Sequence, residues 1–214
     1  MLDYCKLCKQ QKKLIRAHLL PDGLKKFAMS ETDSSLVMID PDTGWHKHKQ
    51  TLEHDPKILC QDCDGLIGIS EDALQTFIQM FLDHPDRNNK GDQKITINCP
   101  SDRIILAILA ILLKYSFSNR HSHIQLGQKY ERIISDAILS DMVPKEYGTK
   151  FQIVFMGSNS CVVSKDGTEM DLSRMARSQA SGGKTENYHT YFIQPPGTWI
   201  AIKVGNAPWP PLAR

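Results

Sequence analysis

The sequence predicts an α+β fold built from three regions of different character. Residues 1–85 contain two Cys-x-x-Cys pairs and several histidines, residues 86–147 show helical spacing of apolar side chains, and residues 148–214 have the composition of β-strands. With 214 residues, 41% of them hydrophobic, the chain is long enough to bury a core without disulfide bonds. We therefore expect an N-terminal module, a helical middle region and a β-rich C-terminal region.

Charge and hydropathy argue against a strongly basic nucleic-acid-coating protein and against a membrane-spanning protein. Lys and Arg number 26 and Asp and Glu number 24, so the net charge of +2 lacks the strongly basic balance of a protein that coats nucleic acid. The longest apolar run, Ile104 to Leu113, is short of the roughly 20 residues that a membrane helix needs. The sequence shows no signal-peptide pattern. We expect a cytoplasmic protein with no membrane partner, in which the six cysteines are thiols or metal ligands.

Two cysteine pairs are the strongest chemical signal in the N-terminal region. Cys5 and Cys8 form the first pair, and Cys60 and Cys63 form the second. Each Cys-x-x-Cys turn can direct two thiolates at one ion, so the four residues predict a structural Zn²⁺ site. The 51 residues between the pairs exceed the spacing of a compact zinc ribbon, which predicts a folded insert. A redox pair, or two independent reduced pairs, is the alternative.

Apolar spacing in the centre of the chain predicts three helices. They span residues 70–82, 101–115 and 130–139, and the second is apolar on almost every side, as a helix inside the core is. The polar stretch 86–92 predicts an exposed loop and a domain boundary. His121 and His123 have no acidic neighbour in the sequence, so we expect them in a loop that links two helices.

The pattern changes to that of a sheet after residue 147. Four segments rich in β-branched and aromatic residues predict strands at 151–155, 161–163, 191–193 and 199–204. Residues 174–184 contain Ser181-Gly182-Gly183 and predict a mobile loop. The proline-rich segment 207–211 predicts an extended tail.

Two motifs in residues 1–82 carry a resemblance to a known family. Leu14-Ile15-Arg16-Ala17-His18-Leu19-Leu20-Pro21 contains a His-x-x-Pro motif, and Leu59-Cys60-Gln61-Asp62-Cys63-Asp64 contains a Leu-Cys-x-x-Cys motif. Together with the first cysteine pair, these motifs resemble those of the HNH, or His-Me finger, nucleases. The resemblance implies a zinc-bound treble-clef or ββα-like module, with the histidine on a strand and the second cysteine pair at the start of a helix.

The resemblance also implies roles for single residues. His18 matches the general base that activates water, and an imidazole titrates in the pH range that this role needs. Asp55 lies nearest the place of the family's asparagine, which helps to orient that base. Ala17 stands where the family has a metal ligand. Asp64 stands where the family has a second, histidine ligand, and its carboxylate is a suitable ligand for Mg²⁺ or Mn²⁺.

Other polar residues of the N-terminal region are candidates to complete this site. His46 and His48 alternate along one side of an extended segment and are candidate ligands of a catalytic divalent ion. Arg16, Lys25 and Lys26 are candidate phosphate contacts.

Each of these residues also has a structural interpretation. His18 lies among apolar neighbours and could bond to the backbone, while Asp64 could cap a helix. His46 and His48 could lie in a solvated loop, and the lysine pair could be a solvated surface.

The combined prediction is an HNH-like zinc protein that binds nucleic acid, with DNA favoured by the resemblance, and hydrolyses phosphodiester bonds with Mg²⁺ or Mn²⁺. The alternative is a catalytically inactive zinc-finger module that recognises a protein or a nucleic acid, with phage–host conflict as one setting. In that case the surface near Tyr188, Tyr191, Trp199 and Trp209 is a candidate binding surface. The sequence does not define the oligomeric state or the role of residues 86–214.

Overall fold

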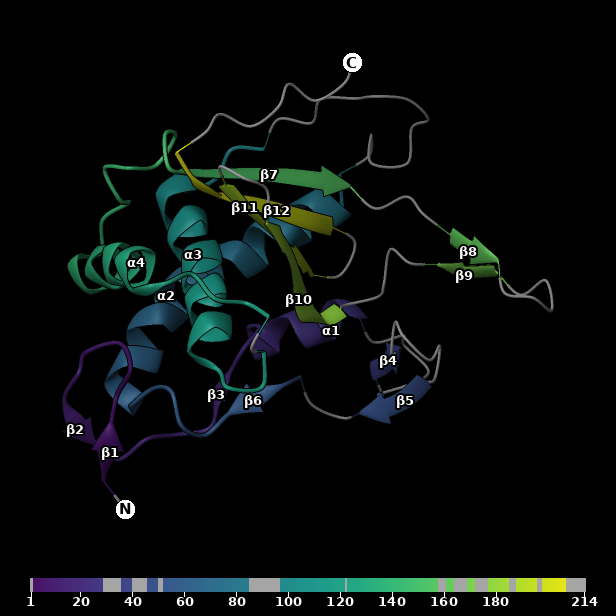
Figure 1. Ribbon diagram of the computed structural model, residues 1–214. Coiled ribbons are helices and arrows are strands. Elements are labelled where there is room, and N and C mark those ends of the chain that lie inside the picture. Colours follow the sequence, from purple (N-terminus) through teal and green to yellow (C-terminus); the bar gives the residue numbers. More distant parts are fainter. Residues whose placement is uncertain are drawn as a thin grey trace.

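A computed structural model gives the arrangement of most of the chain (Figure 1). The structure describes residues 2–28, 36–39, 46–49, 52–84, 97–121, 123–157, 161–163, 169–171, 177–184, 188–195 and 198–206. Runs of helices and small antiparallel sheets occupy separate stretches of these ranges, which confirms the predicted α+β class. Among the described helices, none combines the length and the apolar character needed to cross a membrane.

Short paired strands make up the N-terminal region. β1 (Asp3–Tyr4) pairs with β2 (Gln11–Lys12), and β3 (Ala17–His18) pairs with β6 (His54–Asp55), both antiparallel. Between β3 and β6 come a 3₁₀ turn, η1 (Asp22–Leu24), the one-turn helix α1 (Lys25–Ala28), and the paired strands β4 (Leu36–Ile39) and β5 (His46–Lys49). The folded insert predicted between the cysteine pairs is therefore present.

The longest helix, α2, begins at the second cysteine pair. It spans Gln61–Leu82, and Cys60 precedes it in an extended conformation. Its buried residues recur at helical spacing along one side: Cys63, Ile67, Ser70, Leu74 and Ile78. The apolar spacing predicted a start at residue 70, nine residues too late, whereas the resemblance placed the second cysteine pair at the start of a helix, as the structure does. Gly65 and Gly68 lower the helix propensity of the first turns, but the buried side chains around them hold the helix together.

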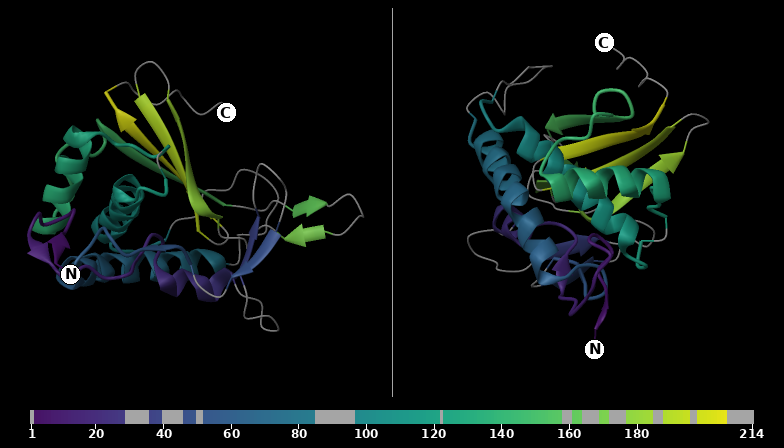
Figure 2. Two further views of the ribbon diagram at one scale, coloured as in Figure 1. Left: turned by 60° about the horizontal axis from the view of Figure 1, so that its bottom comes forward. Right: turned by 90° about the vertical axis from the view of Figure 1, so that its left-hand side faces the viewer.

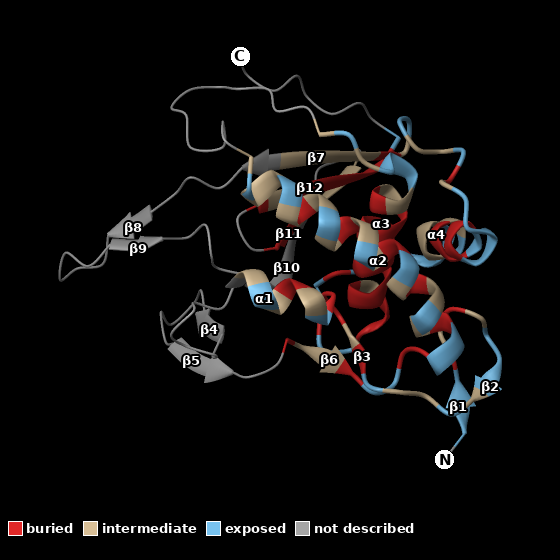
Figure 3. Cartoon of the chain, turned by 180° about the vertical axis from the view of Figure 1, so that it is seen from behind, coloured by how far each residue is buried: buried red, intermediate tan, exposed pale blue. Residues whose placement is uncertain are grey.

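Two further helices follow, close to their predicted positions. α3 (Ser101–Phe117) is buried over most of its surface, as its apolar sequence predicts, and α4 (Gln128–Ser140) ends at Asp141 in the left-handed conformation. α2 packs along α3, and α4 packs beside α3 (Figure 1). The burial colouring in Figure 3 shows α3 as the most buried helix.

The C-terminal part forms a four-stranded antiparallel sheet with the strand order β10-β11-β12-β7. Its strands are β7 (Phe151–Gly157), β10 (Arg177–Lys184), β11 (Tyr188–Gln194) and β12 (Thr198–Gly205), while β8 (Cys161–Val163) and β9 (Glu169–Asp171) pair separately. In Figure 2 this sheet lies on the side of α3 away from α2. α3 is thus enclosed between a helix and a sheet.

One sequence prediction in the sheet is wrong. Residues 177–184 form strand β10 and not a mobile loop. Gly182 lies opposite Tyr191 and Gly183 lies opposite Thr190 of β11, so the neighbouring strand supplies the side chains that the glycines lack. The predicted loop at 86–92 and the predicted tail at 207–211 lie outside the described residues.

A single core cluster joins the three predicted regions. It contains Leu7 and Leu19 from the N-terminal region, Ile108 from α3, and Ile200 and Ile202 from β12. The described parts of residues 1–85, 86–147 and 148–214 therefore share one buried interior, although each has its own type of secondary structure. The boundaries between them remain a prediction.

Candidate metal centre and adjacent histidine site

The four predicted zinc ligands come together in space. The sulfur atoms of Cys5, Cys8, Cys60 and Cys63 all lie within 4.8 Å of one another. Cys5, Cys60 and Cys63 are buried, and Cys8 is half-buried. Four converging cysteines are the donor set of a structural Zn²⁺ site, so these residues fit the predicted ion. The prediction that the two pairs share one site agrees with this geometry.

Local backbone geometry explains how the pairs reach this arrangement. After the first pair, Lys9 adopts the left-handed conformation and its N–H donates to the carbonyl of Cys5, which closes a tight turn. The second pair lies at the N-terminus of α2, where the helix dipole favours negative charge such as that of thiolates. The N–H of Cys60 donates to Sγ of Cys5 over 3.4 Å, so the two pairs are also bonded directly.

The thiols of the cluster differ in pKa because their surroundings differ. Burial raises the pKa of Cys5, but backbone N–H donors lower it further, with a net result of about 7. Burial and the neighbouring sulfur atoms raise the pKa of Cys63 well above its ordinary value. One thiol is therefore prepared to ionise near neutral pH, whereas another needs a cation to ionise. This is the behaviour expected of a ligand set built for a metal.

Backbone pairing connects the cysteine cluster to the histidine motif. Leu14 forms a β-bridge with Cys60, and the N–H of Ile15 donates to the carbonyl of Leu59. The same two segments continue as β3 and β6, which lie side by side in Figure 1. Residues 14–18 and residues 54–60 therefore form a two-stranded ribbon, which we call the ribbon. One end of the ribbon is the candidate zinc ligand Cys60, and the other end holds His18.

Two histidines and Arg16 meet on the outer side of this ribbon, and Arg120 reaches the backbone of one of the histidines. His18 lies directly opposite His54, with 6.1 Å between ring centroids, and the His18 side chain is 37% exposed. A guanidinium nitrogen of Arg16 lies 2.5 Å from Nε2 of His54, and Arg120 donates to the carbonyl of His54 over 3.1 Å. We call Arg16, His18, His54 and Arg120 the ribbon site. It concentrates cationic and titratable groups on a solvent-accessible surface.

The inner side of the ribbon carries Ala17 and Asp55. Side chains alternate along a strand, so the pair Ala17–Asp55 lies on the side opposite the pair His18–His54. The Asp55 carboxylate is buried and accepts hydrogen bonds from the Ser118 hydroxyl, at 2.7 Å, and from the N–H of Lys57, at 2.9 Å. It anchors the ribbon to the loop after α3. The residue directly across from the predicted base is thus His54, whereas Asp55, the residue expected to help orient that base, faces the opposite side of the ribbon.

A buried pair that the sequence analysis missed lies on the same inner side. Nε2 of His121 lies 3.0 Å from Oε2 of Glu53, and both side chains are largely buried. Burial, with the negative charge of Glu53, raises the pKa of the adjacent Tyr115. The prediction that His121 has no acidic companion is therefore wrong. Glu53 lies 68 positions away in sequence, so an inspection of sequence neighbours could not reveal it.

The remaining predicted site residues are not assembled around His18. Among the residues that the structure describes, the four cysteines are the only group of three or more His, Cys, Asp or Glu side chains whose ligand atoms lie close enough to share an ion. Asp64 is half-buried in the first turn of α2, where its N–H donates to the carbonyl of Cys60. Nε2 of His18 instead lies 3.5 Å from a carboxylate oxygen of Asp22.

Four predicted residues cannot be placed at the site. The side chains of His46 and His48 lie outside the described part of the chain, and their role as metal ligands stays a prediction. Lys25 and Lys26 begin α1, and the amine of Lys26 lies 4.8 Å from the centroid of the Phe27 ring. Their contact with phosphate also stays a prediction.

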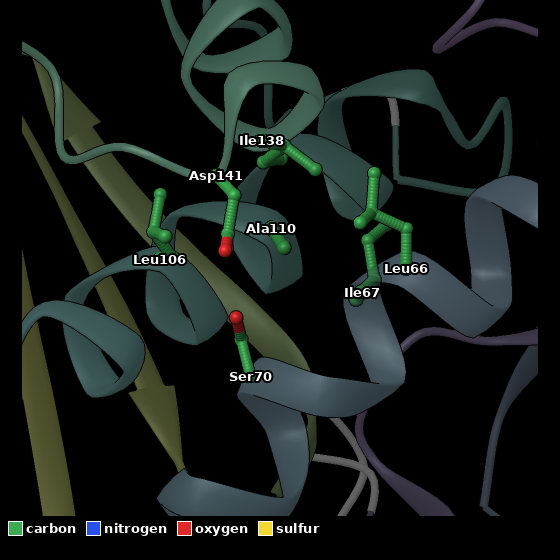
Figure 4. Close-up of a pocket in the computed structure, with 7 residues that line it drawn as sticks. All are labelled: Leu66, Ile67, Ser70, Leu106, Ala110, Ile138 and Asp141. Carbon is green, nitrogen blue, oxygen red and sulfur yellow. The ribbon is translucent and has the colours of Figure 1, made fainter. Parts of the chain in front are cut away.

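A small pocket between α2, α3 and α4 is not a substrate site. In Figure 4 the Ser70 hydroxyl and the Asp141 carboxylate point toward one another across it, with Leu66, Ile67, Leu106, Ala110 and Ile138 around them. It has room for about one water molecule. The ribbon site is therefore the stronger candidate for binding a ligand.

Comparison of the chain with protein-family models, with curated proteins and with solved structures finds no match in any of the three.

Proposed function

We propose that this chain is a zinc-stabilised protein that binds nucleic acid at the ribbon site and cleaves its phosphodiester backbone there. The observation that carries the proposal is that Arg16, His18 and His54 converge on the outer side of the ribbon, with the exposed guanidinium of Arg120 bonded to the backbone carbonyl of His54. Guanidinium groups bind phosphate oxygens through paired, charge-assisted hydrogen bonds. Imidazoles beside a bound phosphate can transfer the protons that cleavage of a phosphodiester requires.

The order of elements supports the resemblance to HNH nucleases. A strand with the histidine (β3), an antiparallel partner (β6) and a helix that starts at the second cysteine pair (α2) occur in that order, with the cysteine cluster at their base. The resemblance favours DNA as the substrate, with Mg²⁺ or Mn²⁺ as an added cation and Asp64 as its ligand. In this proposal Zn²⁺ has a structural role, because a four-cysteine set leaves the ion no open position for substrate.

Binding tests the first part of the proposal. Arg16→Gln and Arg120→Gln should each weaken the binding of labelled DNA and RNA oligonucleotides, measured by fluorescence anisotropy, and flatten its dependence on salt by about one unit of slope per lost phosphate contact. Arg132→Gln removes the same charge from an exposed position on α4 and should leave binding unchanged. Equal binding by all three variants would refute the ribbon site as the nucleic-acid surface.

Cleavage tests the second part. Plasmid DNA and RNA are both offered as substrates. His18→Ala should abolish whichever cleavage the wild-type protein shows, while zinc content, measured by mass spectrometry, stays at the wild-type level. The assay is run with and without Mg²⁺ or Mn²⁺. Cleavage that persists in the His18 variant would remove His18 from the chemistry.

A binding module without catalysis is the second candidate. The buried Ala17, with no ligand atom at the position of a standard metal ligand, favours it. Binding at the ribbon site without cleavage of DNA or RNA under any of these conditions would select this candidate.

A further inference from the structure

We infer that His54 is a second catalytic imidazole beside His18, and that the pair cleaves RNA through the substrate's own 2′-hydroxyl. The inference rests on the proposed function, because it requires nucleic acid at the ribbon site. It adds a residue to which the HNH resemblance gives no role, and it names the class of substrate.

The spacing of the two rings fits one phosphate. Their centroids lie 6.1 Å apart, they come from directly opposed positions of two paired strands, and both are accessible to solvent. An imidazole that exchanges a proton must lie about 3 Å from the oxygen concerned. Two imidazoles at this separation can therefore reach the attacking and the leaving oxygen of a single phosphorus atom.

The partners of the two rings give them complementary hydrogen positions. The guanidinium of Arg16 has only donors, so Nε2 of His54, which lies 2.5 Å from it, presents a lone pair. A carboxylate oxygen of Asp22 lies 3.5 Å from Nε2 of His18, and because a carboxylate has only acceptors it favours a hydrogen on that nitrogen. One ring is thus arranged to accept a proton and the other to donate one, as an acid–base pair requires.

Arg16 has one contact in the free protein and another when phosphate is bound. In the free protein Arg16 covers the lone pair of His54. A phosphate oxygen is a stronger acceptor for a guanidinium than a neutral imidazole is, so bound substrate draws Arg16 away and exposes Nε2 of His54. Arg120, whose exposed guanidinium donates to the backbone carbonyl of the same residue, adds a second positive charge next to His54.

The substrate class follows from the residues around His18. Hydrolysis of DNA needs an activated water, for which HNH enzymes use a cation held next to the base. Here the sequence neighbour of His18 is Ala17, which is buried and has no ligand atom, and its partner across the ribbon is the internally bonded Asp55. RNA brings its own nucleophile, so the acid–base pair and the two guanidinium groups are sufficient for cleavage.

The step balances with the groups present. His54 takes the proton from the 2′-hydroxyl, and the 2′-oxygen forms a bond to phosphorus. The bond from phosphorus to the 5′-oxygen breaks, and His18 gives its proton to that oxygen. The products are a 2′,3′-cyclic phosphate and a 5′-hydroxyl. No oxidant, reductant or water is consumed.

Three oligonucleotides of one sequence test the substrate class with the full chain in its zinc-bound form: RNA, DNA and 2′-O-methyl RNA. We expect cleavage of RNA alone, without added Mg²⁺ or Mn²⁺, and a 2′,3′-cyclic phosphate in the mass spectrum of the product. Binding of RNA without its cleavage would overturn the inference and leave the proposed binding function intact. Cleavage of DNA that requires Mg²⁺ or Mn²⁺, with RNA uncut, would also overturn the inference and leave the proposed function intact. Failure to bind any of the three would overturn the proposed function itself.

Asparagine variants test the two histidines without removing their partners. His54→Asn keeps an acceptor for Arg16 and His18→Asn keeps a donor for Asp22, but neither can exchange a proton, so each should reduce RNA cleavage at least 100-fold. His84→Ala is the control, because it follows the end of α2, a 22-residue helix about 33 Å long that begins at the cysteine cluster. Wild-type zinc content and circular dichroism confirm folding. Full activity of His54→Asn would overturn the inference even if His18→Asn were inactive.

A substrate with a 5′-bridging sulfur assigns the two roles. A thiolate leaves without protonation, so this substrate no longer needs the acid. We expect it to restore cleavage by His18→Asn and not by His54→Asn. The reverse pattern, or no rescue of either variant, would overturn the assignment of base and acid.

Discussion

Glu53 of the segment before β6 and His121 of the loop after α3 face one another with 3.0 Å between Oε2 and Nε2. Next to them the Ser118 hydroxyl donates to Asp55 over 2.7 Å. Residues from the helical region therefore hold the inner side of the ribbon whose outer side carries His18 and His54. The ribbon site depends on α3 and its following loop as much as on the cysteine cluster.

Removal of His121 should weaken the ribbon without touching its outer side. His121→Ala leaves the largely buried Glu53 carboxylate without its partner, and we expect a loss of about 1–3 kcal/mol in the free energy of unfolding by urea. His123→Ala, at an exposed position of the same loop, should change it by less than about 0.5 kcal/mol. Equal losses in the two variants would show that the Glu53–His121 pair has no special part in stability.

Removal of Zn²⁺ should unfold the N-terminal region first. The four cysteines join the β1–β2 hairpin to the start of α2, and among the described strands β1 and β2 pair only with one another, over two residues each. We expect a chelator to remove hydrogen-exchange protection from residues 2–20 and 52–64 before it affects β12. A Cys8→Ser variant should behave as the chelated protein does. Unchanged protection after the loss of zinc would mean that the ion is dispensable for the fold.

Zinc affinity should rise with pH. The lowered pKa of Cys5, about 7, supplies a thiolate near neutral pH, while the raised pKa of Cys63 means that this thiol loses its proton only as the ion binds. Protons therefore compete with Zn²⁺, and the apparent affinity should fall as the pH is lowered from about 8 to about 6. Competition with a fluorescent zinc indicator measures this dependence. A flat profile would contradict the four-thiolate ligand set.

The ion pair between α2 and α3 should show strong coupling. Nζ of Lys114 lies 2.5 Å from Oε1 of Glu71, and the side chains are 2% and 13% exposed. Glu71→Leu leaves a buried ammonium group without a partner and should cost about 3–5 kcal/mol, whereas the double variant Glu71→Leu/Lys114→Met should cost less than that single variant. A urea double-mutant cycle measures the difference. Additive losses would show that the two groups do not stabilise one another.

A carboxylate at position 17 should destabilise the fold. Ala17 is fully buried and lies directly opposite Asp55, so Ala17→Asp places two carboxylates on the buried side of the ribbon. We expect a lower melting temperature for this variant, with partial recovery in Ala17→Asp/Asp55→Asn because one charge is then removed. A melting temperature equal to that of the wild type would mean that residue 17 can turn outward and act as a ligand.

Short-range sequence patterns predicted two of the long helices, two strands of the sheet and the cysteine cluster. The apolar spacing of α3 and α4 and the composition of β11 and β12 predicted those elements to within a few residues. The two Cys-x-x-Cys pairs predicted the cysteine cluster for the same reason, since zinc ligation has a nearly fixed spacing in sequence. Where tertiary contacts override propensity, as at Gly65 and Gly68 in α2 and at the Ser181-Gly182-Gly183 segment of β10, the predictions failed.

The histidine site was only half predictable. The motif around His18 identified one imidazole, but the register of a two-residue strand pair decides what lies opposite it. A shift of one residue would have placed a neighbour of His54 across from His18 and turned His54 inward. Glu53 and His121 meet through the packing of α3, and no periodic pattern encodes that contact.

The strand order has a consequence for the way the chain is made. β12 follows all other described strands in sequence, yet it lies in the interior of the sheet, hydrogen-bonded to β11 on one side and to β7 on the other. During synthesis β7 therefore leaves the ribosome long before its partner exists and must wait with an unpaired edge. The helices and the cysteine cluster can assemble first, but the sheet that encloses α3 can close only after β12 has emerged, so closure of this sheet follows the formation of the other described elements.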